Sequence, residues 1–424
     1  MPISTVSLCP GVQGVYLENH SFHTTLVSVN FYLPHRRESA APLALLSSLL
    51  VGCCQKYPDY LELNRALSAL YGADISSAVQ KNGDRLCLRF YASVINDTHA
   101  FAGEKPVWET ARLLLSMLFE PRVRNQAFFA EDVNREKRKL LEHIDGEINE
   151  KRIYAQKRLI EEMFRNDPYG VPRYGSRESV ERLTGEELYW AWQELISSAR
   201  VSVNVIGPDS PKSLFEAVRE RFLAVDRVPV ADLSTLPAAA CEEVRTVSET
   251  MQVAQGKMVM GFTCRAGDDD ETLATLAAVD IFGGGPYSRL FQYVREKQSL
   301  CYYCSASAVR SKGFLTVACG IEAENVERAK DEILKQLDDM KNGRFTDFEL
   351  ASSLKNIADT LKTYNDSPGA LDAYYSSKAF SGRVYSPAEL SGKIAALTRE
   401  EIRKAAEEIR LHTVYELLPQ EEEK

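Results

Sequence analysis

The sequence predicts an α+β fold of two homologous domains, each an antiparallel sheet backed by helices. The chain has 424 residues, which is too long for one ordinary hydrophobic core and suits two domains. Two long stretches repeat the same order of patterns, and several segments alternate apolar and polar residues as strands of half-buried antiparallel sheets do. Duplication of one α+β unit explains all three observations.

The repeat begins in each half with a strand, an apolar helix and a strand pair around a glycine turn. The matching segments of the first half are SVNFYLPH (28–35), APLALLSSLLVG (41–52) and LNRALSALYGADISSAVQKNGDRLCLRFYA (63–92). Those of the second half are MVMGFTCR (258–265), DETLATLAAVDIFGGG (270–285) and FQYVREKQSLCYYCSASAVRSKGFLTVACG (291–320). Leu70 matches Leu300 and Gly83 matches Gly313, both at an offset of 230 (300 − 70 and 313 − 83).

Later elements of the two halves also agree. LTGEEL at 183–188 matches LTREEI at 397–402 at an offset of 214 (397 − 183). Each segment has a threonine and, three positions on, a glutamate, which is the spacing of a capping box at a helix start. Ser386, Pro387 and Glu389 predict a further helix start, and a terminal strand follows each capped helix.

The region between the halves predicts the domain boundary. Residues 126–164 place apolar side chains at steps of four and seven, which predicts one long amphipathic helix. Residues 226–243 lose this periodicity and carry two prolines, which is typical of a linker. We therefore expect a first domain at 1–225, a linker at 226–243 and a second domain at 244–424.

Composition excludes some partners and favours one compartment. The net charge of −9 argues against a general binder of nucleic acid or anionic membranes, both of which reward clustered Lys and Arg. The first twenty residues lack a secretory signal pattern, and the most apolar stretch, 42–52, is too short to span a bilayer. Nine cysteines favour reduced thiols over a disulfide framework, so we expect a cytoplasmic protein.

Cys301 and Cys304 form a CxxC motif, which is used elsewhere for redox chemistry or metal binding. They lie in a run typical of a strand, where residues i and i+3 point to opposite faces. No second CxxC lies at the spacing of a zinc ribbon. We interpret both as ordinary strand residues.

Residues 283–320 resemble the second-domain signature of the M16 (insulinase or pitrilysin-type) peptidases. In that signature a glycine run is followed by SRLF and by RE..L.Y before a strand pair, as in GGGPYSRLFQYVREKQSLCYY here. NDPYGVPRYGSRESVERLT at 166–184 is similar to the family's segment H/N-x-P-Y-G…G…LT. The resemblance covers nearly the whole chain and implies a fold like that of mitochondrial processing peptidase.

The family's zinc site has no counterpart in the sequence. M16 peptidases carry HxxEH on a first-domain helix, where two histidines hold zinc and the glutamate activates water. The matching stretch, LALLSSLLVGCCQKYP at 43–58, contains no His, Glu or Asp. The third ligand would fall at or beside Glu142 and His143, and these alone cannot hold a tetrahedral metal. The resemblance therefore implies a non-catalytic member with no metal, no cofactor and no catalytic residue.

A second part of the family's site does match. In the family, an arginine and a tyrosine seven residues later help bind the substrate backbone and stabilise an oxyanion. These positions match Arg295 and Tyr302 (302 − 295 = 7). We predict both as substrate-binding residues, because a guanidinium and a phenol can donate to a peptide carbonyl, a carboxylate or an oxyanion. In the alternative, Arg295 merely ends a helix and Tyr302 packs in a sheet.

These observations favour a non-catalytic M16-like subunit that binds an extended peptide and pairs, as a heterodimer, with a zinc-bearing M16 homologue. Metallopeptidase activity is expected only with an HxxEH partner, and none from the chain alone. The alternative is a binding or scaffold protein of the same fold in a protein-modification pathway, because some zinc-less bacterial relatives are associated with the modification of elongation factor P. The sequence has no GxSxG setting for an autonomous hydrolase.

Overall fold

The computed structural model describes residues 3–380 and 382–420. The chain divides into two compact units, each built from segments that are not contiguous in sequence. The first unit contains the described residues up to Ile144, together with Val171–Ser234 and Asn365–Phe380. The second contains Asp145–Gly170, Thr235–Tyr364 and the described residues from 382 on.

The first unit is built on a six-stranded sheet in the order β1-β2-β8-β3-β5-β4. Its strands are β1 (Ile3–Cys9), β2 (Val12–Glu18), β3 (Thr24–Pro34), β4 (Asp74–Asn82), β5 (Arg85–Ile95) and β8 (Arg200–Gly207). β4 and β5 form the expected hairpin, whose turn contains Gly83 at φ 61°. A glycine suits this left-handed conformation because it has no Cβ.

Helices cover one face of this sheet around the main hydrophobic core. They are α1 (Arg37–Gly52), α3 (Pro106–Phe119), α7 (Gly185–Ser198) and α8 (Lys212–Leu223). Alternate β3 residues such as Phe31 and Leu33 point into this core, where Phe31 meets Phe90 of β5 edge to face. Shorter or peripheral elements are α2 (Tyr60–Ala69), η1 (Asp97–His99), the strand pair β6 (Val123–Arg124) and β7 (Ala127–Phe128), and α6 (Arg177–Arg182).

The opposite face of the same sheet is polar and, over β3 and β8, also buried, because α12 (Pro368–Ser377) packs on these two strands. Asp372 of this helix is fully buried and accepts hydrogen bonds from Ser28, Arg89 and Asn204. The alternation in the strands therefore marks an apolar face and a buried, hydrogen-bonded polar face, where the sequence alone predicts a solvent-exposed one.

The second unit is built on a five-stranded sheet in the order β11-β12-β10-β13-β9. Its strands are β9 (Arg245–Met251), β10 (Gly256–Thr263), β11 (Cys301–Val309), β12 (Phe314–Ile321) and β13 (Arg410–Pro419). Within the described residues, one neighbouring pair in each sheet is parallel, β2 with β8 and β9 with β13, and the others are antiparallel. The α+β class with two similar, helix-backed sheets is confirmed, but the sheets are mixed and not purely antiparallel.

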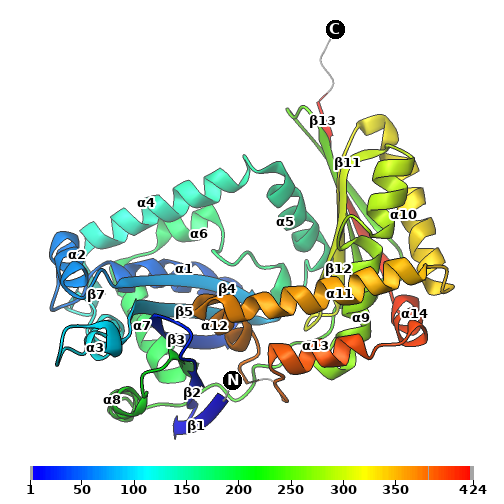
Figure 1. The fold of residues 1–424 in the computed structure, drawn as a ribbon. Coiled ribbons are helices and arrows are strands. Elements are labelled where there is room, and N and C mark those ends of the chain that lie inside the picture. The colour runs from blue at the N-terminus through cyan, green and yellow to red at the C-terminus, as the bar shows by residue number, and fades with distance from the viewer. Residues whose placement is uncertain (1–2, 381, 421–424) are drawn as a thin grey trace. The chain divides into compact units, whose positions relative to one another are not determined.

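Helices lie on both faces of the second sheet, with α5 (Lys151–Met163) on one side and the helices around α10 on the other (Figure 1). α5 packs on β10 and β13, where Gly261 leaves room for Leu159 and Met163. The other helical elements of this unit are η2 (Pro168–Gly170), α9 (Asp269–Gly283), η3 (Leu290–Lys297), η4 (Ala323–Asn325), α10 (Val326–Lys341), α11 (Asp347–Thr363), α13 (Pro387–Ala395) and α14 (Arg399–Glu407). The short element η5 (Tyr364–Asp366) spans the division between the units after Tyr364.

The two halves of the sequence exchange a helix. α5 comes from the first half but belongs to the second unit, and α12 comes from the second half but belongs to the first. The single long helix predicted over 126–164 is therefore wrong: α4 (Ala130–Glu147) and α5 are separate, with a break at 148–150. Gly146 lies in the last turn of α4 and Asn149 lies in the break, and both are poor helix formers.

The predicted helix starts are confirmed. Thr184 with Glu187, Ser386 with Glu389 and Thr398 with Glu401 all form capping boxes at helix N-termini. Residues 226–243 contain no helix or strand, and the two units divide between Ser234 and Thr235 within this stretch.

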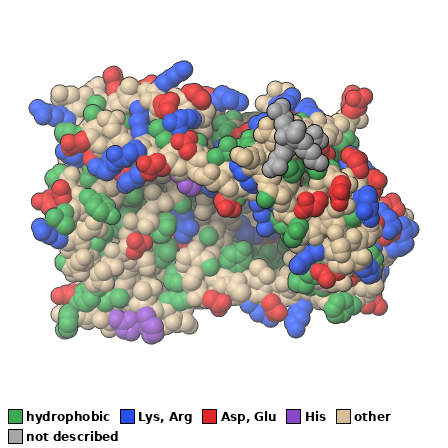
Figure 2. Space-filling model, turned by 90° about the horizontal axis from the view of Figure 1, so that it is seen from above, with side chains coloured by type: hydrophobic (Ala, Val, Ile, Leu, Met, Phe, Trp, Pro, Cys, Tyr) green, Lys and Arg blue, Asp and Glu red, His purple; other side chains and the backbone are tan. Residues whose placement is uncertain are grey.

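Among the described residues, no helix combines the length and apolar character needed to cross a bilayer. Figure 2 shows acidic and basic side chains mixed over one face of the molecule, without a continuous basic area among the side chains it colours. This mixture agrees with the charge balance of the sequence.

Candidate functional site

Helix α1 lies at the position where the resemblance places a zinc-binding helix, but its buried side chains contribute to the hydrophobic core. Its buried side chains are alanines, leucines and Ser47, and it packs on α7 and β4. The hydroxyls of Ser47 and Ser48 donate to the carbonyls of Ala44 and Leu45, at 2.9 and 3.1 Å. Its one acidic residue is Glu38 in the first turn, and it has no histidine. A single carboxylate does not fit a zinc ion, which takes three or four protein ligands.

The residues near the expected third ligand do not assemble a metal site either. Glu142 and His143 are exposed on α4, and the His143 ring packs edge to face on Tyr174 with ring centroids 5.1 Å apart. Cys53, at the end of α1, lies 3.6 Å from Asp132, but burial raises the pKa of its thiol to about 11. Across residues 3–380 and 382–420, no group of three or more His, Cys, Asp or Glu residues could hold a metal ion.

Arg295 lies on η3, a π-helical segment that is preceded by a buried arginine. Arg289, just before this segment, pairs with Asp339 at 2.9 Å and with Glu349 at 3.4 Å. Leu290 and Val294 are buried, whereas the Arg295 side chain is 41% exposed, lies over the Phe291 ring and is 3.6 Å from Glu296. π-Helical turns are rare and frequently occur at functional sites.

Tyr302 projects from a bulge in β11. Cys301 pairs with Ile321 and Tyr303 with Gly320, so Tyr302 is an extra residue without its own cross-strand partner. Its side chain is 67% exposed. Ser299, just before the strand, has φ 51°, a left-handed conformation uncommon for a residue with a side chain. Strained residues and bulges often re-aim side chains beside binding sites.

Arg295 and Tyr302 line the same pocket, whose volume is about 420 Å³. Ser299, Leu300 and Cys301 line it between them, and Glu296, Glu322 and Asn325 complete it. The pocket therefore combines a guanidinium and a phenol with two carboxylates and an amide. Such a set can donate to carbonyl or carboxylate oxygens and accept from amide or ammonium groups.

The bulge also overturns the interpretation of Cys301 and Cys304. Strict alternation would point them to opposite faces, but the extra residue at Tyr302 reverses the alternation between them. Both thiols are buried, while Tyr302 is exposed. The two cysteines thus lie on the same face of the sheet, a feature that the CxxC spacing alone could not reveal.

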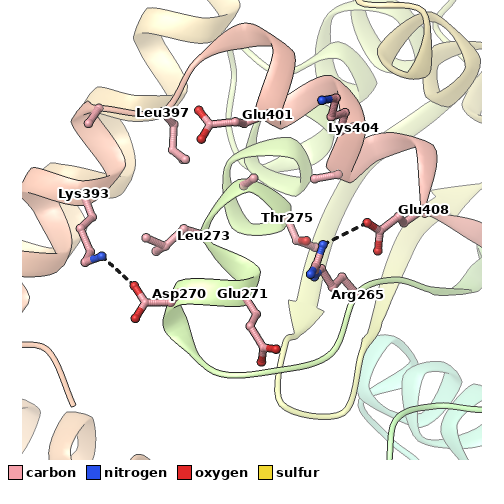
Figure 3. Close-up of a pocket in the computed structure, with 13 residues that line it drawn as sticks. Arg265, Asp270, Glu271, Leu273, Thr275, Lys393, Leu397, Glu401, Lys404 and Glu408 are labelled. Carbon is pink, nitrogen blue, oxygen red and sulfur yellow. Dashed lines mark hydrogen bonds and ion pairs between the residues drawn. The ribbon is translucent and has the colours of Figure 1, made fainter. Parts of the chain in front are cut away.

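A second pocket of the same unit lies between α9, α13 and α14 (Figure 3). Two ion pairs lie in it, Lys393 with Asp270 at 2.6 Å and Arg265 with Glu408 at 3.4 Å. Two further carboxylates of its lining, Glu271 and Glu401, accept the backbone N–H groups that close capping boxes. Its carboxylates are therefore engaged in structural contacts, and we favour the pocket around Arg295 as the binding site.

Comparisons with known proteins agree with this description. A family model described as "Peptidase M16 inactive domain" matches residues 182–357. The chain is 29% identical over 409 residues to "Probable inactive metalloprotease YmfF" of Bacillus subtilis, covering 96% of this chain and 95% of that protein. The resemblance to the M16 family is thereby confirmed.

Solved structures show the same fold. A conserved protein from Enterococcus faecalis V583 matches with a TM-score of 0.91 at 24% identity, over 100% of both chains. A structure from Pseudomonas fluorescens described as a peptidase M16 inactive domain matches with a TM-score of 0.80 at 17% identity, again over 100% of both chains.

Proposed function

We propose that this chain, which resembles the M16 peptidases but lacks their zinc-binding motif, is a cytoplasmic, non-catalytic subunit. In this proposal it binds peptide and pairs with a zinc-bearing M16 homologue. The pocket formed by Arg295 and Tyr302 carries the proposal. Both side chains are exposed at one cavity, and each comes from an irregular piece of backbone, the π-helical η3 and the bulge in β11.

The chemistry of this pocket suits the backbone of an extended peptide. Arg295 offers a planar fork of N–H donors to a carbonyl or a terminal carboxylate, and Tyr302 offers one O–H donor. Glu296 and Glu322 supply acceptors for amide N–H groups or an N-terminal ammonium. β11 is an edge of the described sheet, and an edge strand can pair with an extended chain through its own backbone groups.

The partner follows from what α1 lacks. Hydrolysis of a peptide bond by this family's chemistry needs a metal to activate water, and residues 43–58, which match the zinc-binding stretch, contain no His, Glu or Asp. A second M16 chain with an intact HxxEH helix would supply the metal, while the chain described here would supply donors for the peptide. We therefore expect turnover by the pair and none by this chain alone.

Coexpression with an HxxEH homologue from the same genome tests the proposal. We expect the two chains to copurify and to cleave a library of quenched fluorescent peptides. The variants Arg295→Ala and Tyr302→Phe should each lower kcat/KM about 10- to 100-fold by removing a donor, without loss of copurification.

Two variants control for surface changes of the same size. Arg265→Ala removes an arginine with a similar single ion pair and exposure, and Tyr60→Phe alters a tyrosine that is likewise 67% exposed. Both should cleave like the native pair. If the complex with Arg295→Ala cleaves peptides as well as the complex with Arg265→Ala, Arg295 does not contribute to peptide binding. A chain that never copurifies with an HxxEH homologue, but does with a protein-modifying enzyme, would support the scaffold function instead.

A further inference from the structure

Three cysteines of the second unit meet on one face of its sheet. Cys304 of β11 and Cys319 of β12 are direct cross-strand partners, with their sulfur atoms 3.0 Å apart. Cys301 joins them on this face because the bulge at Tyr302 turns it to their side. Residues directly opposite in an antiparallel pair have Cα atoms about 4.5–5.5 Å apart, within the range that a disulfide spans.

All three cysteines are buried, with exposed fractions of 8% for Cys301, 5% for Cys304 and 0% for Cys319. Cys301 lines the pocket that also contains Arg295 and Tyr302. Of the three cysteines, Cys301 is therefore the one that a small reagent in this pocket meets, because Cys304 and Cys319 do not line it.

The surroundings also make Cys301 the most acidic of the three. Hydrogen bonds from Cys304 and Cys319, with help from the Arg295 charge, lower the pKa of the Cys301 thiol despite its burial. Burial raises the pKa of the Cys304 thiol, and a hydrogen bond to Cys301 raises that of the Cys319 thiol. The thiolate is the nucleophilic form of cysteine, so reactivity is concentrated at Cys301.

We propose that Cys301, Cys304 and Cys319 form an oxidisable thiol site for hydrogen peroxide, in which Cys301 reacts first and Cys304 and Cys319 end as a cross-strand disulfide. The site does not depend on the peptide-binding function. A buried cross-strand dithiol beside a third cysteine that lines a pocket has the arrangement of resolving thiols and an attacking thiol.

The steps balance with hydrogen peroxide as the only oxidant. The Cys301 thiolate attacks one peroxide oxygen, the O–O bond breaks, and the departing hydroxide takes a proton to leave as water. The Cys319 thiol attacks the resulting sulfenic sulfur, and its proton leaves with the sulfenic oxygen as a second water. Cys304 then attacks the Cys319 sulfur, which forms the cross-strand disulfide and returns Cys301 as a thiol.

Mass spectrometry of the full chain tests the proposal. The reduced protein is treated with hydrogen peroxide, alkylated in denaturant and digested with trypsin, which cleaves after Lys297, Arg310, Lys312 and Arg328. We expect a disulfide that joins peptide 298–310 to peptide 313–328. Fragmentation between residues 301 and 304 should assign the bond to Cys304, with Cys301 alkylated.

Variants locate the first reaction. Cys301→Ser should slow disulfide formation at least about tenfold, because the remaining thiols are buried and un-ionised. In the double variant Cys304→Ser/Cys319→Ser, a dione reagent should trap a sulfenic acid at Cys301. Cys264→Ser is the matched control: Cys264 is more exposed than Cys301, but burial raises the pKa of its thiol to about 12.

Far-UV circular dichroism checks that each variant is folded. If Cys264 is oxidised before any Cys304–Cys319 bond forms, exposure and not the thiol cluster decides reactivity, and the proposal is wrong. It is equally wrong if Cys301→Ser forms the disulfide as fast as the native chain.

Discussion

Replacing Asp372 by alanine tests what holds the exchanged helix α12 on the sheet of the first unit. The Asp372 carboxylate is fully buried and accepts a hydrogen bond from Arg89 Nε at 2.7 Å. It also accepts from Ser28 Oγ at 2.8 Å and Asn204 Nδ2 at 2.7 Å. Ser376 Oγ donates to it as well, at 3.3 Å. Alanine would leave the buried guanidinium and these three buried donors without this acceptor.

The cost of this change follows from the burial of both partners. The Arg89 side chain is only 9% exposed, and breaking a buried ion pair from one side costs about 3–5 kcal/mol. The losses at Ser28 and Asn204 overlap with this figure, because Asn204 Nδ2 keeps a bond to Ser376 Oγ at 3.1 Å and water can enter the space. With a urea dependence of about 2–3 kcal/mol per molar, the unfolding midpoint should fall by about 1–2.5 M.

Tryptophan fluorescence measures this unit alone, because Trp108, Trp190 and Trp192 are the three tryptophans of the chain and all lie in the first unit. The double variant Arg89→Met/Asp372→Leu should recover to within about 1 kcal/mol of the native chain, since it removes both charges and keeps volume. Glu131→Gln, which breaks an exposed ion pair, is the control and should shift the midpoint by less than about 0.5 M. A shift that small for Asp372→Ala, or a double variant as unstable as the single one, would refute this account of α12.

Two further predictions concern protons and metal. Burial lowers the pKa of His35, and the hydrogen bond to the Val171 carbonyl at 2.9 Å opposes this shift only in part. As pH falls, the unfolded chain therefore binds the proton before the folded chain does, so the first unit should lose stability below about pH 6.5. In the variant His35→Gln, the urea midpoint should depend less on pH. An unchanged dependence of the midpoint on pH would contradict this role of His35. Metal analysis of the purified chain should find no stoichiometric zinc. One zinc per chain, together with peptide cleavage that a chelator abolishes, would show that our interpretation of α1 as a helix without a zinc site is wrong.

The sequence predicts those features of the fold that depend on local patterns. Capping residues, glycine turns and strand alternation act within a few positions, so the duplicated order of elements could be read from them. The exchange of α5 and α12 could not, because it is decided by which sheet face each helix covers. Asp372 looks like an ordinary helix residue until Arg89, more than 280 positions earlier, is placed beside it.

At the candidate site, too, the sequence shows which residues are present but not how the backbone orients them. The Arg295 and Tyr302 spacing is visible in the sequence, but their exposure depends on a π-helical turn and a bulge that no composition rule marks. An extra residue in a strand reverses the side of every residue beyond it. One insertion at Tyr302 thus has two consequences: it turns the tyrosine outward into the pocket, and it brings Cys301 to the face that Cys304 and Cys319 share. Deleting Tyr302 should therefore disturb the peptide pocket and the thiol cluster together, whereas Tyr302→Phe should disturb only the first.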